Sequence, residues 1–372
     1  MEDSAADLLE AARQTYFVQR SRRPGIELAV SAGKRLRDPA LLIESGRFLL
    51  REQQYDELNE LAGWCADQEP VRGLGLALQG AVVVWKEGPT PEAADLFNRG
   101  AQQPGLTGYN QLNASIVASN ARFLAPPAAP PPLPPFSSPM RGRKRVIVVA
   151  ADEVYLDLFA ENLAANIRRL APKIGIHIHL YCREEGSWSR ALEQQANPQS
   201  YLTGISLSGE LTNLRQYYMI GRYIHLPRIM DLTGAGTVLL SDIDAMFLES
   251  PEAAFDLIET ADIGIAEHKS YTFPWMNYRG NFSGFTDTEK SRAMLAAVSG
   301  FLSVLDPKAH VYATDQLALM QAFFAAGESG TRVADLREIL HSRTVQATGG
   351  GGDPAGKQRR LAEAFEKQVR PR

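Results

Sequence analysis

The proline-rich segment from Ala125 to Pro139, APPAAPPPLPPFSSP, constrains the fold of this 372-residue chain more than any other feature. Proline fixes φ and lacks a backbone N–H, so such a stretch cannot continue a helix or a central strand. We predict a semi-rigid linker over residues 125–142, between a domain at 1–124 and another at 143–372. A docking segment for a proline-binding domain is the alternative interpretation.

The composition narrows the class of protein. The chain is 45% hydrophobic and 22% charged, as in ordinary globular proteins, and its net charge of −4 argues against a dedicated nucleic-acid binder. Its two cysteines, Cys65 and Cys182, lie far apart without metal-site spacing, which suits a reducing compartment. The first residues are acidic and amphipathic, unlike a signal peptide, and we see no apolar run of the ~20 residues that a membrane span needs. We therefore expect a cytoplasmic protein that binds no nucleic acid.

The region before the linker is predicted to be α-helical. Windows that begin at Ser45 and Gln79 align at an offset of 34 residues, which pairs Gly46 with Gly80. This offset is similar to the period of tetratricopeptide repeats, whose helix pairs stack into a surface that often binds a protein partner. Thr90 before Pro91 predicts a helix start. A plain helical packing domain is the alternative.

Beyond the linker, strand and helix patterns alternate. Apolar runs predict strands, and residues 156–170 and 214–230 have helical spacing. The predicted strands are Arg145–Ala151, Ile174–Cys182, Thr237–Leu240 and Ile263–Ala266. Such alternation predicts an α/β fold with a mainly parallel sheet, and ligands bind at the carboxyl ends of its strands. Asp152, Asp242 and Asp244 should therefore lie along one edge.

Asp242 and Asp244 follow a buried strand directly. In an extended segment, side chains at i and i+2 point the same way, so both carboxylates could face one cation. Hard oxygen ligands suit Mn²⁺ or Mg²⁺, which commonly bind a substrate diphosphate. The alternative is a capped loop that leads into the next helix. The pair alone is a weak signal, and its position after a strand makes it informative.

Asp152 and Tyr155 follow the first predicted strand. They could cap and pack the next helix, or bind a nucleotide base through the carboxylate and the aromatic ring. Neither a G-x-G-x-x-G nor a P-loop follows this strand, so a Rossmann cofactor or an ATP-hydrolysing site is not expected.

Five stretches together resemble the GT-A glycosyltransferases, especially the family 8 type and related nucleotide-diphospho-sugar transferases. They are VIVVAADEVYLDLF, GRYIHLPRIM, GTVLLSDIDAMFLES, GNFSGF and YATDQLALMQAF, in this order between residues 145 and 324. The resemblance implies a metal-dependent enzyme that transfers a sugar from a nucleotide-diphospho-sugar, with UDP as the expected nucleotide and with retention of configuration. The acceptor could be a glycan, a lipid or a protein.

The resemblance also implies roles for individual residues. Asp152 and Tyr155 match the uracil-binding acid and ring, Arg222 the cation near the diphosphate, and Asp315 and Gln316 the step beside the transferred sugar. The metal ligands would be Asp242, Asp244 and His341. The nucleotide-sugar contacts would come from Ala150, Ala151, Asp152, Tyr155, Arg222, Asp242, Ile243, Asn281, Ser283 and Gly284. Phe282 stands where the family has asparagine, and the glycine and lysine expected soon after His341 are displaced towards Gly349–Gly352 and Lys357.

Other functions fit less well. A haloacid-dehalogenase-type phosphatase would have threonine or valine where Met246 stands, and a sugar nucleotidyltransferase would have a glycine-rich first loop. A tetratricopeptide scaffold with an inactive transferase-like domain is the non-enzymatic alternative.

Two further patterns lie outside these motifs. The pair His177 and His179 predicts a polar strand face, since no third zinc ligand is spaced to join it. The basic C-terminal segment predicts either a packed helix or weak peripheral contact with an anionic membrane.

Overall fold

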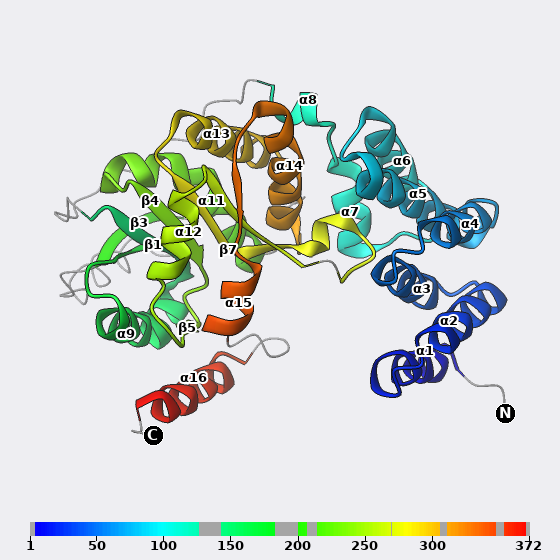
Figure 1. Ribbon diagram of the computed structural model, residues 1–372, viewed down its shortest axis with the longest axis horizontal. Coiled ribbons are helices and arrows are strands. Elements are labelled where there is room, and N and C mark those ends of the chain that lie inside the picture. Colours follow the sequence, from blue (N-terminus) through cyan, green and yellow to red (C-terminus); the bar gives the residue numbers. More distant parts are fainter. Residues whose placement is uncertain are drawn as a thin grey trace. The chain divides into compact units, whose positions relative to one another are not determined.

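The computed structural model describes residues 4–125, 143–182, 200–206, 214–268, 270–305, 311–346 and 353–369 (Figure 1). The chain forms two compact units. The first contains Met1–Phe123, His268–Tyr278 and Val311–Phe324; the second contains Leu124–Glu267, Arg279–His310 and Ala325–Arg372. Two segments from the later part of the chain thus belong to the first unit. Apart from Ala125, the predicted linker lies outside the described residues.

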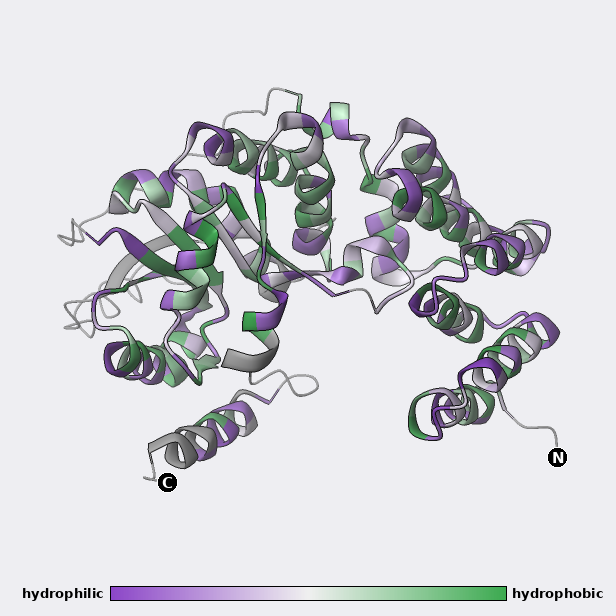
Figure 2. Ribbon diagram, viewed as in Figure 1, coloured by the Kyte–Doolittle hydropathy of each residue, from purple (hydrophilic) through white to green (hydrophobic). Residues whose placement is uncertain are grey.

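The first unit is helical, and from α1 to α7 each helix packs against the next. Figure 2 shows hydrophobic residues along one side of these helices and hydrophilic residues along the other. The helices are α1 (Ala5–Arg13), α2 (Arg22–Leu36), α3 (Pro39–Arg51), α4 (Tyr55–Ala66), α5 (Arg72–Glu87), α6 (Pro91–Ala101), α7 (Gly108–Ile116) and α8 (Asn120–Phe123), with a π-helical turn at Gln14–Val18 and a 3₁₀ turn at Glu69–Val71. The predicted start of α6 is confirmed, because the Thr90 side chain accepts a hydrogen bond from the Ala93 N–H. The tetratricopeptide assignment remains a prediction.

The two inserted segments complete the core of this unit. The 3₁₀ turn η3 (Pro274–Asn277) carries Trp275, which is fully buried and packs edge-on against Phe97 of α6. Helix α14 (Thr314–Ser329) begins in this unit, where Asn113 of α7 accepts a hydrogen bond from the Thr314 hydroxyl at 3.1 Å.

A seven-stranded sheet forms the centre of the second unit, in the order β3-β2-β1-β4-β7-β6-β8. Strands β1, β2, β3 and β4 pair in parallel, β7 runs antiparallel to β4, and β6 pairs with β8 in parallel. The strands are β1 (Arg145–Asp152), β2 (Gly175–Cys182), β3 (Ser200–Ser206), β4 (Thr237–Ser241), β6 (Ile263–Glu267), β7 (Tyr278–Thr286) and β8 (Val333–Asp335); β5 (Ala245–Phe247) and β9 (Thr344–Gln346) form a separate antiparallel pair. The α/β class with a mainly parallel sheet is confirmed.

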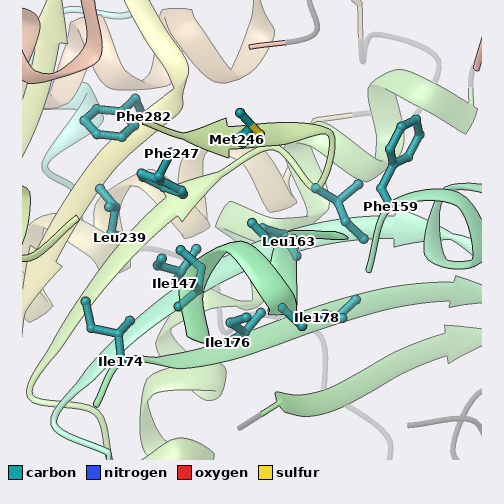
Figure 3. Packing of buried hydrophobic residues seen from close by; sticks show 14 of the residues in the cluster. Ile147, Phe159, Leu163, Ile174, Ile176, Ile178, Leu239, Met246, Phe247 and Phe282 are labelled. Atoms are coloured by element: carbon teal, nitrogen blue, oxygen red, sulfur yellow. The ribbon is translucent and has the colours of Figure 1, made fainter. Parts of the chain in front are cut away.

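The helices of this unit include the two that were predicted. They are α9 (Glu153–Leu170), α11 (Leu214–Thr233), α12 (Glu252–Glu259), α13 (Glu289–Ser303), α15 (Arg337–Arg343) and α16 (Pro354–Val369). Figure 3 shows Leu163 of α9 near Ile176 and Ile178 of β2, and Phe159 of α9 and Ile147 of β1 belong to the same buried apolar cluster. Leu361 of α16 belongs to the same buried cluster. Among the described residues, no helix combines the length and apolar character needed to cross a membrane.

Strand β2 is buried along its whole length, which corrects one expectation. His177 and His179 were expected on a polar strand face, yet they are 1% and 0% exposed. The reason is that β2 lies between β1 and β3, as an interior strand of a parallel sheet, and such strands are covered on both faces.

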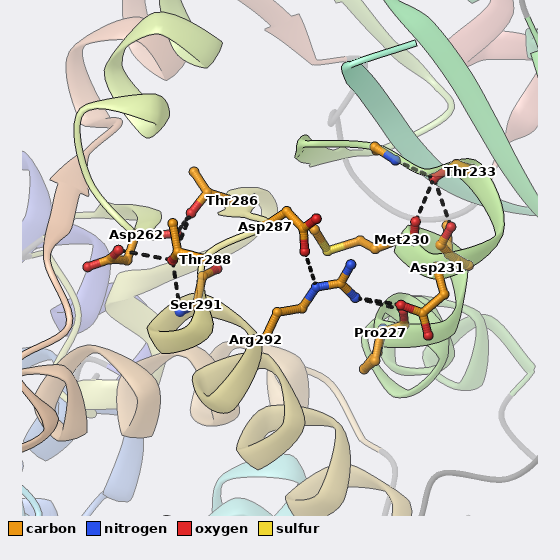
Figure 4. Close-up of polar contacts among 12 residues, drawn as sticks. Pro227, Met230, Asp231, Thr233, Asp262, Thr286, Asp287, Thr288, Ser291 and Arg292 are labelled. Carbon is orange, nitrogen blue, oxygen red and sulfur yellow. Dashed lines mark hydrogen bonds and ion pairs between the residues drawn. The ribbon is translucent and has the colours of Figure 1, made fainter. Parts of the chain in front are cut away.

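A polar network holds the amino end of α13 to its neighbours (Figure 4). Arg292 donates to Asp287 at 2.7 Å and to Asp231 of α11 at 3.0 Å. Thr288 caps α13 and donates to Asp262 at 3.0 Å. β7 ends at Thr286, which pairs with Thr237, the first residue of β4. The network therefore lies where β4 begins, away from its carboxyl end.

Candidate active site

The carboxyl ends of β1 and β4 lie at the same edge of the sheet. The two strands pair in parallel, with Val148 opposite Leu240, so Asp152 and the turn after Ser241 leave the sheet on the same side. This is the edge at which open parallel sheets bind ligands.

The first functional side chains lie at the junction of β1 and α9. Asp152 caps α9 by accepting a hydrogen bond from the Tyr155 N–H at 2.8 Å. The capping interpretation is therefore confirmed, and it leaves one carboxylate oxygen for other contacts. Tyr155 is half-buried and packs against Phe159, with 5.2 Å between ring centroids. Ala151 is buried just before this junction, and Ala150 is partly exposed.

Asp242 is held by two of the other predicted residues. Arg222 of α11 is 2% exposed and donates to Asp242 Oδ1 at 3.0 Å, to Ser241 O at 2.9 Å and to Gly280 O at 2.9 Å. Asn281 Nδ2 donates to Asp242 Oδ2 at 3.2 Å. Side chains from α11, from the turn after β4 and from β7 thus converge on one carboxylate, which is 24% exposed.

The alternation of β7 explains how Asn281 reaches this cluster. Adjacent residues of a strand face opposite sides of the sheet. Phe282 points into the apolar core, as Figure 3 shows, and Asn281 points towards Asp242. Farther along the strand, Ser283 is buried and shares a hydrogen bond with Tyr223 at 2.8 Å, and Gly284 leaves no room for a side chain beside Ile258.

Asp244 has a different partner. Its Oδ2 lies 2.6 Å from Nζ of Lys357, in the first turn of α16, and the two side chains are 8% and 6% exposed. Lys357 Nζ also lies 3.4 Å from the Tyr155 hydroxyl and 5.5 Å from the centre of its ring. Asp244, Tyr155 and Lys357 therefore form a second cluster beside the first.

The backbone at the two aspartates differs from the extended segment that was expected, and their shared binding of one cation stays a prediction. β4 ends at Ser241, and residues 242–244 form a turn before β5, so the alternation of a strand does not apply to them. Each carboxylate meets a basic side chain of its own. Ile243, between them, is 3% exposed and belongs to the apolar core.

Electrostatics at Asp244 are dominated by burial. Burial and the neighbouring charge of Asp242 raise the pKa of Asp244, and Lys357 partly offsets this rise. Burial lowers the pKa of Lys357, but the hydrogen bond and charge of Asp244 outweigh it, so the pKa lies above the usual value of lysine. The raised pKa of Lys357 favours its charged form, whereas the raised pKa of Asp244 opposes ionisation of that carboxyl, so the ammonium group is what holds the carboxylate charged.

Asp315 and Gln316 belong to the first compact unit, whereas the aspartate clusters belong to the second. They lie in the first turn of α14, where they are 2% and 6% exposed. Ala313, just before them, has a φ of +69°, a conformation that side-chain-bearing residues seldom adopt.

The carboxylate oxygens at this edge are of the chemical type that binds a hard divalent ion. Asp242 and Asp244 supply carboxylate oxygens, the ligands that Mn²⁺ and Mg²⁺ prefer, and such ions often complete their shell with water and phosphate. No group of three or more His, Cys, Asp or Glu able to hold a metal occurs in the described part of the chain. The side chain of His341 lies outside the described residues, so its predicted role stays a prediction.

Lys357 is a site residue that the sequence named only as the displaced lysine of the motif after His341, and not as a candidate. A usable signal was present, because Lys357 and Leu361 are four residues apart and share a helix face. Leu361 is 4% exposed, so the lysine on the same face should also have been expected to point inwards.

No protein-family model and no curated protein matches this chain. Among solved structures, the galactosyltransferase LgtC, in complex with donor and acceptor sugar analogs, is 13% identical with a TM-score of 0.39; the match covers 61% of this chain and 97% of LgtC. The glycosyltransferase GlyE of Streptococcus pneumoniae TIGR4 is 15% identical with a TM-score of 0.37, over 54% of this chain and 47% of GlyE. Mouse xyloside xylosyltransferase 1 is 11% identical with a TM-score of 0.33, over 52% and 84% of the two chains.

The match thus spans less than half the length of GlyE. Likenesses this distant do not carry an activity over to this chain. The α/β architecture is consistent with the GT-A fold that the sequence resemblance implies.

Proposed function

We propose that this chain is a GT-A-type glycosyltransferase that moves a sugar from a nucleotide-diphospho-sugar, with UDP as the nucleotide, to a glycan, lipid or protein acceptor. The observation that carries the proposal is the cluster of Arg222, Asp242 and Asn281. These residues come from three separate stretches of the resemblance and meet at the ligand-binding edge of a parallel sheet.

Each cluster has a task in this reaction. Tyr155 offers an aromatic face to the base, and Asp152 has a carboxylate oxygen that can accept from a base N–H. Arg222 holds Asp242 in place and places a fixed positive charge where the leaving diphosphate gains negative charge. Retention of configuration follows from the family 8 resemblance. We propose separately that Asp315 and Gln316 act beside the transferred sugar, as the resemblance implies.

We further propose that Asp242 and Asp244 hold Mn²⁺ or Mg²⁺. The ion would supply Lewis-acid stabilisation of the leaving diphosphate. The protein would contribute two carboxylates fixed by the turn between β4 and β5, with Asn281 orienting the more exposed of them.

The test is a screen for hydrolysis of UDP-, GDP- and ADP-sugars with Mn²⁺, combined with UDP binding. We expect UDP-sugars to be hydrolysed, and UDP with Mn²⁺ to raise the melting temperature, because a ligand that binds only the folded state stabilises it. Tyr155→Ala should weaken UDP binding by about 1–3 kcal/mol through loss of base stacking. Tyr155→Phe is the matched control, since it keeps the ring and removes only the hydroxyl near Lys357.

Unchanged UDP affinity in Tyr155→Ala would mean that the base binds elsewhere. The scaffold alternative predicts neither hydrolysis nor stabilisation by UDP with any metal.

Two partner proposals remain separate from the reaction. The first, helical unit could bind a protein partner, as stacked helical repeats do.

The basic C-terminal segment could contact anionic membranes. Its sequence indicates an apolar face for this, but Leu361 of that face is buried in the core, so less apolar surface is left for a membrane. Salt-sensitive co-sedimentation with anionic liposomes tests it, and recovery in the supernatant at low salt would reject it.

A further inference from the structure

Lys357 is anchored at Asp244 by the packing of its own helix. It lies in the first turn of α16, which packs against α9 and β5, and Leu361 one turn later is buried in the apolar core. The ammonium group is therefore not a freely rotating surface charge. It is inserted between the Asp244 carboxylate and the Tyr155 ring.

A buried carboxylate requires a positive partner. Removing an ionised acid from water is costly, and Asp242, a second acid two residues away, increases that cost. Arg222 already neutralises Asp242. Lys357 does the same for Asp244, so each of these two aspartates has a basic partner within the chain.

This balance conflicts with a divalent ion bound to both aspartates. Mn²⁺ or Mg²⁺ would need to lie about 2.0–2.2 Å from a carboxylate oxygen. Lys357 Nζ lies 2.6 Å from Asp244 Oδ2, so a metal ion bound to that oxygen would lie beside the ammonium group and repel it. They cannot share that oxygen at low cost.

We infer that Lys357 is the resident cation of Asp244, and that a divalent ion engages both aspartates only when α16 withdraws this ammonium group. The inference rests on the proposed metal site and adds a condition to it. Metal binding is then coupled to the position of the C-terminal helix, because Lys357 and Leu361 share one face and move together.

The experiment measures Mn²⁺ binding to the full chain without any nucleotide, by the electron paramagnetic resonance signal of free Mn²⁺. We expect Lys357→Met to bind Mn²⁺ at least about tenfold more tightly than the wild type, because the competing cation is gone. Arg359→Met is the matched control, since it removes an equal charge from the same helix at a side chain that is 72% exposed and pairs with Asp353. It should bind like the wild type. Combining Asp244→Asn with Lys357→Met should abolish the gain.

A second measurement needs no variant. Saturating Mn²⁺ should speed amide hydrogen exchange within residues 354–369 of the wild type, because α16 must loosen. Equal Mn²⁺ affinity in the wild type and Lys357→Met, or no binding by either, would overturn the inference, as would unchanged exchange in α16 at saturation. If Lys357→Met gains Mn²⁺ affinity but the wild type transfers no sugar, the proposed function is rejected. The inference about Lys357 would still hold.

Discussion

Arg222 is the residue on which the geometry around Asp242 depends most. Its guanidinium donates to one carboxylate and to two main-chain carbonyls, and it is almost fully buried. A lysine could not replace this planar set of donors, because its ammonium is a single point with no fork.

We expect Arg222→Ala to lower the free energy of unfolding by about 3–5 kcal/mol, because a carboxylate and two carbonyls lose their partner. Urea denaturation measures this change. Arg228→Ala, at an exposed position of the same helix, should change it by less than about 0.5 kcal/mol. An Arg222→Ala protein with the wild-type urea midpoint would show that the contacts contribute little.

The aspartates show what sequence reasoning can and cannot reach at this scale. Their position after a buried strand was predictable from the apolar run Val238–Leu240. Their separate partners were not, because these contacts are non-local: Arg222 and Asn281 lie 20 and 39 residues from Asp242, and Lys357 lies 113 residues from Asp244. The burial of Asp244 also changes what its substitution means. Asp244→Asn would disturb a buried ion pair as well as a ligand.

At the scale of elements, hydrogen bonds from two side chains, Asn113 and Gln321, connect the region of α7 to the region of α14. Asn113 is fully buried, donates to Tyr312 O at 2.8 Å and accepts from the Thr314 hydroxyl. Gln321 accepts from the Ala118 N–H at 2.9 Å. The start of α14, with its strained Ala313, is therefore fixed by the first unit.

Asn113→Ala should destabilise the protein by about 1–3 kcal/mol, because the buried Thr314 hydroxyl loses one of its acceptors and the Tyr312 carbonyl loses a donor. Thermal unfolding of the full chain is the measurement. Ser115→Ala is the control on the same helix, since its hydroxyl is exposed and bonds only to Leu112 O. Equal melting temperatures for the two variants would contradict the role given to Asn113.

The elements themselves were largely predictable. Strands β1, β2, β4 and β6 and helices α9 and α11 follow from local apolar spacing, which depends on neighbours in sequence. Strand β7 was not predicted as an antiparallel central strand. Its pairing with β4 is non-local, and GNFSGF contains glycine and polar residues that weaken the strand pattern.

For the whole molecule, three buried histidines link stability to pH. Burial lowers the pKa of His177 to about 3, that of His225 to about 4, and that of His179 well below its ordinary value. The rings of His179 and His225 also lie near one another, tilted by 50°, with 5.1 Å between their centroids.

Because these pKa values are lower in the folded state than the ordinary 6.5, the unfolded chain binds protons more readily. Stability is complete above pH 6.5 and falls as the pH drops towards 4, by up to about 1.4 kcal/mol per pH unit for each histidine. Urea denaturation between pH 7 and pH 5.5 measures this loss of stability. Most carboxylates titrate below that range, so they contribute little to the change.

His225→Gln should make the fall in that range shallower than in the wild type. His268→Gln, at a less buried position, should leave the slope close to the wild-type value. The same slope in His225→Gln and the wild type would mean that His225 is not held neutral.

The return of residues 268–278 and 311–324 to the first unit has a consequence for biosynthesis. The helices up to Phe123 leave the ribosome first, but Trp275 and Thr314, which complete their packing, emerge much later. At about 5–20 residues per second, some 200 further residues take roughly 10–40 s to make. During that interval Phe97 and Asn113 lack their final partners, so the nascent chain should be a chaperone client until residue 324 has emerged.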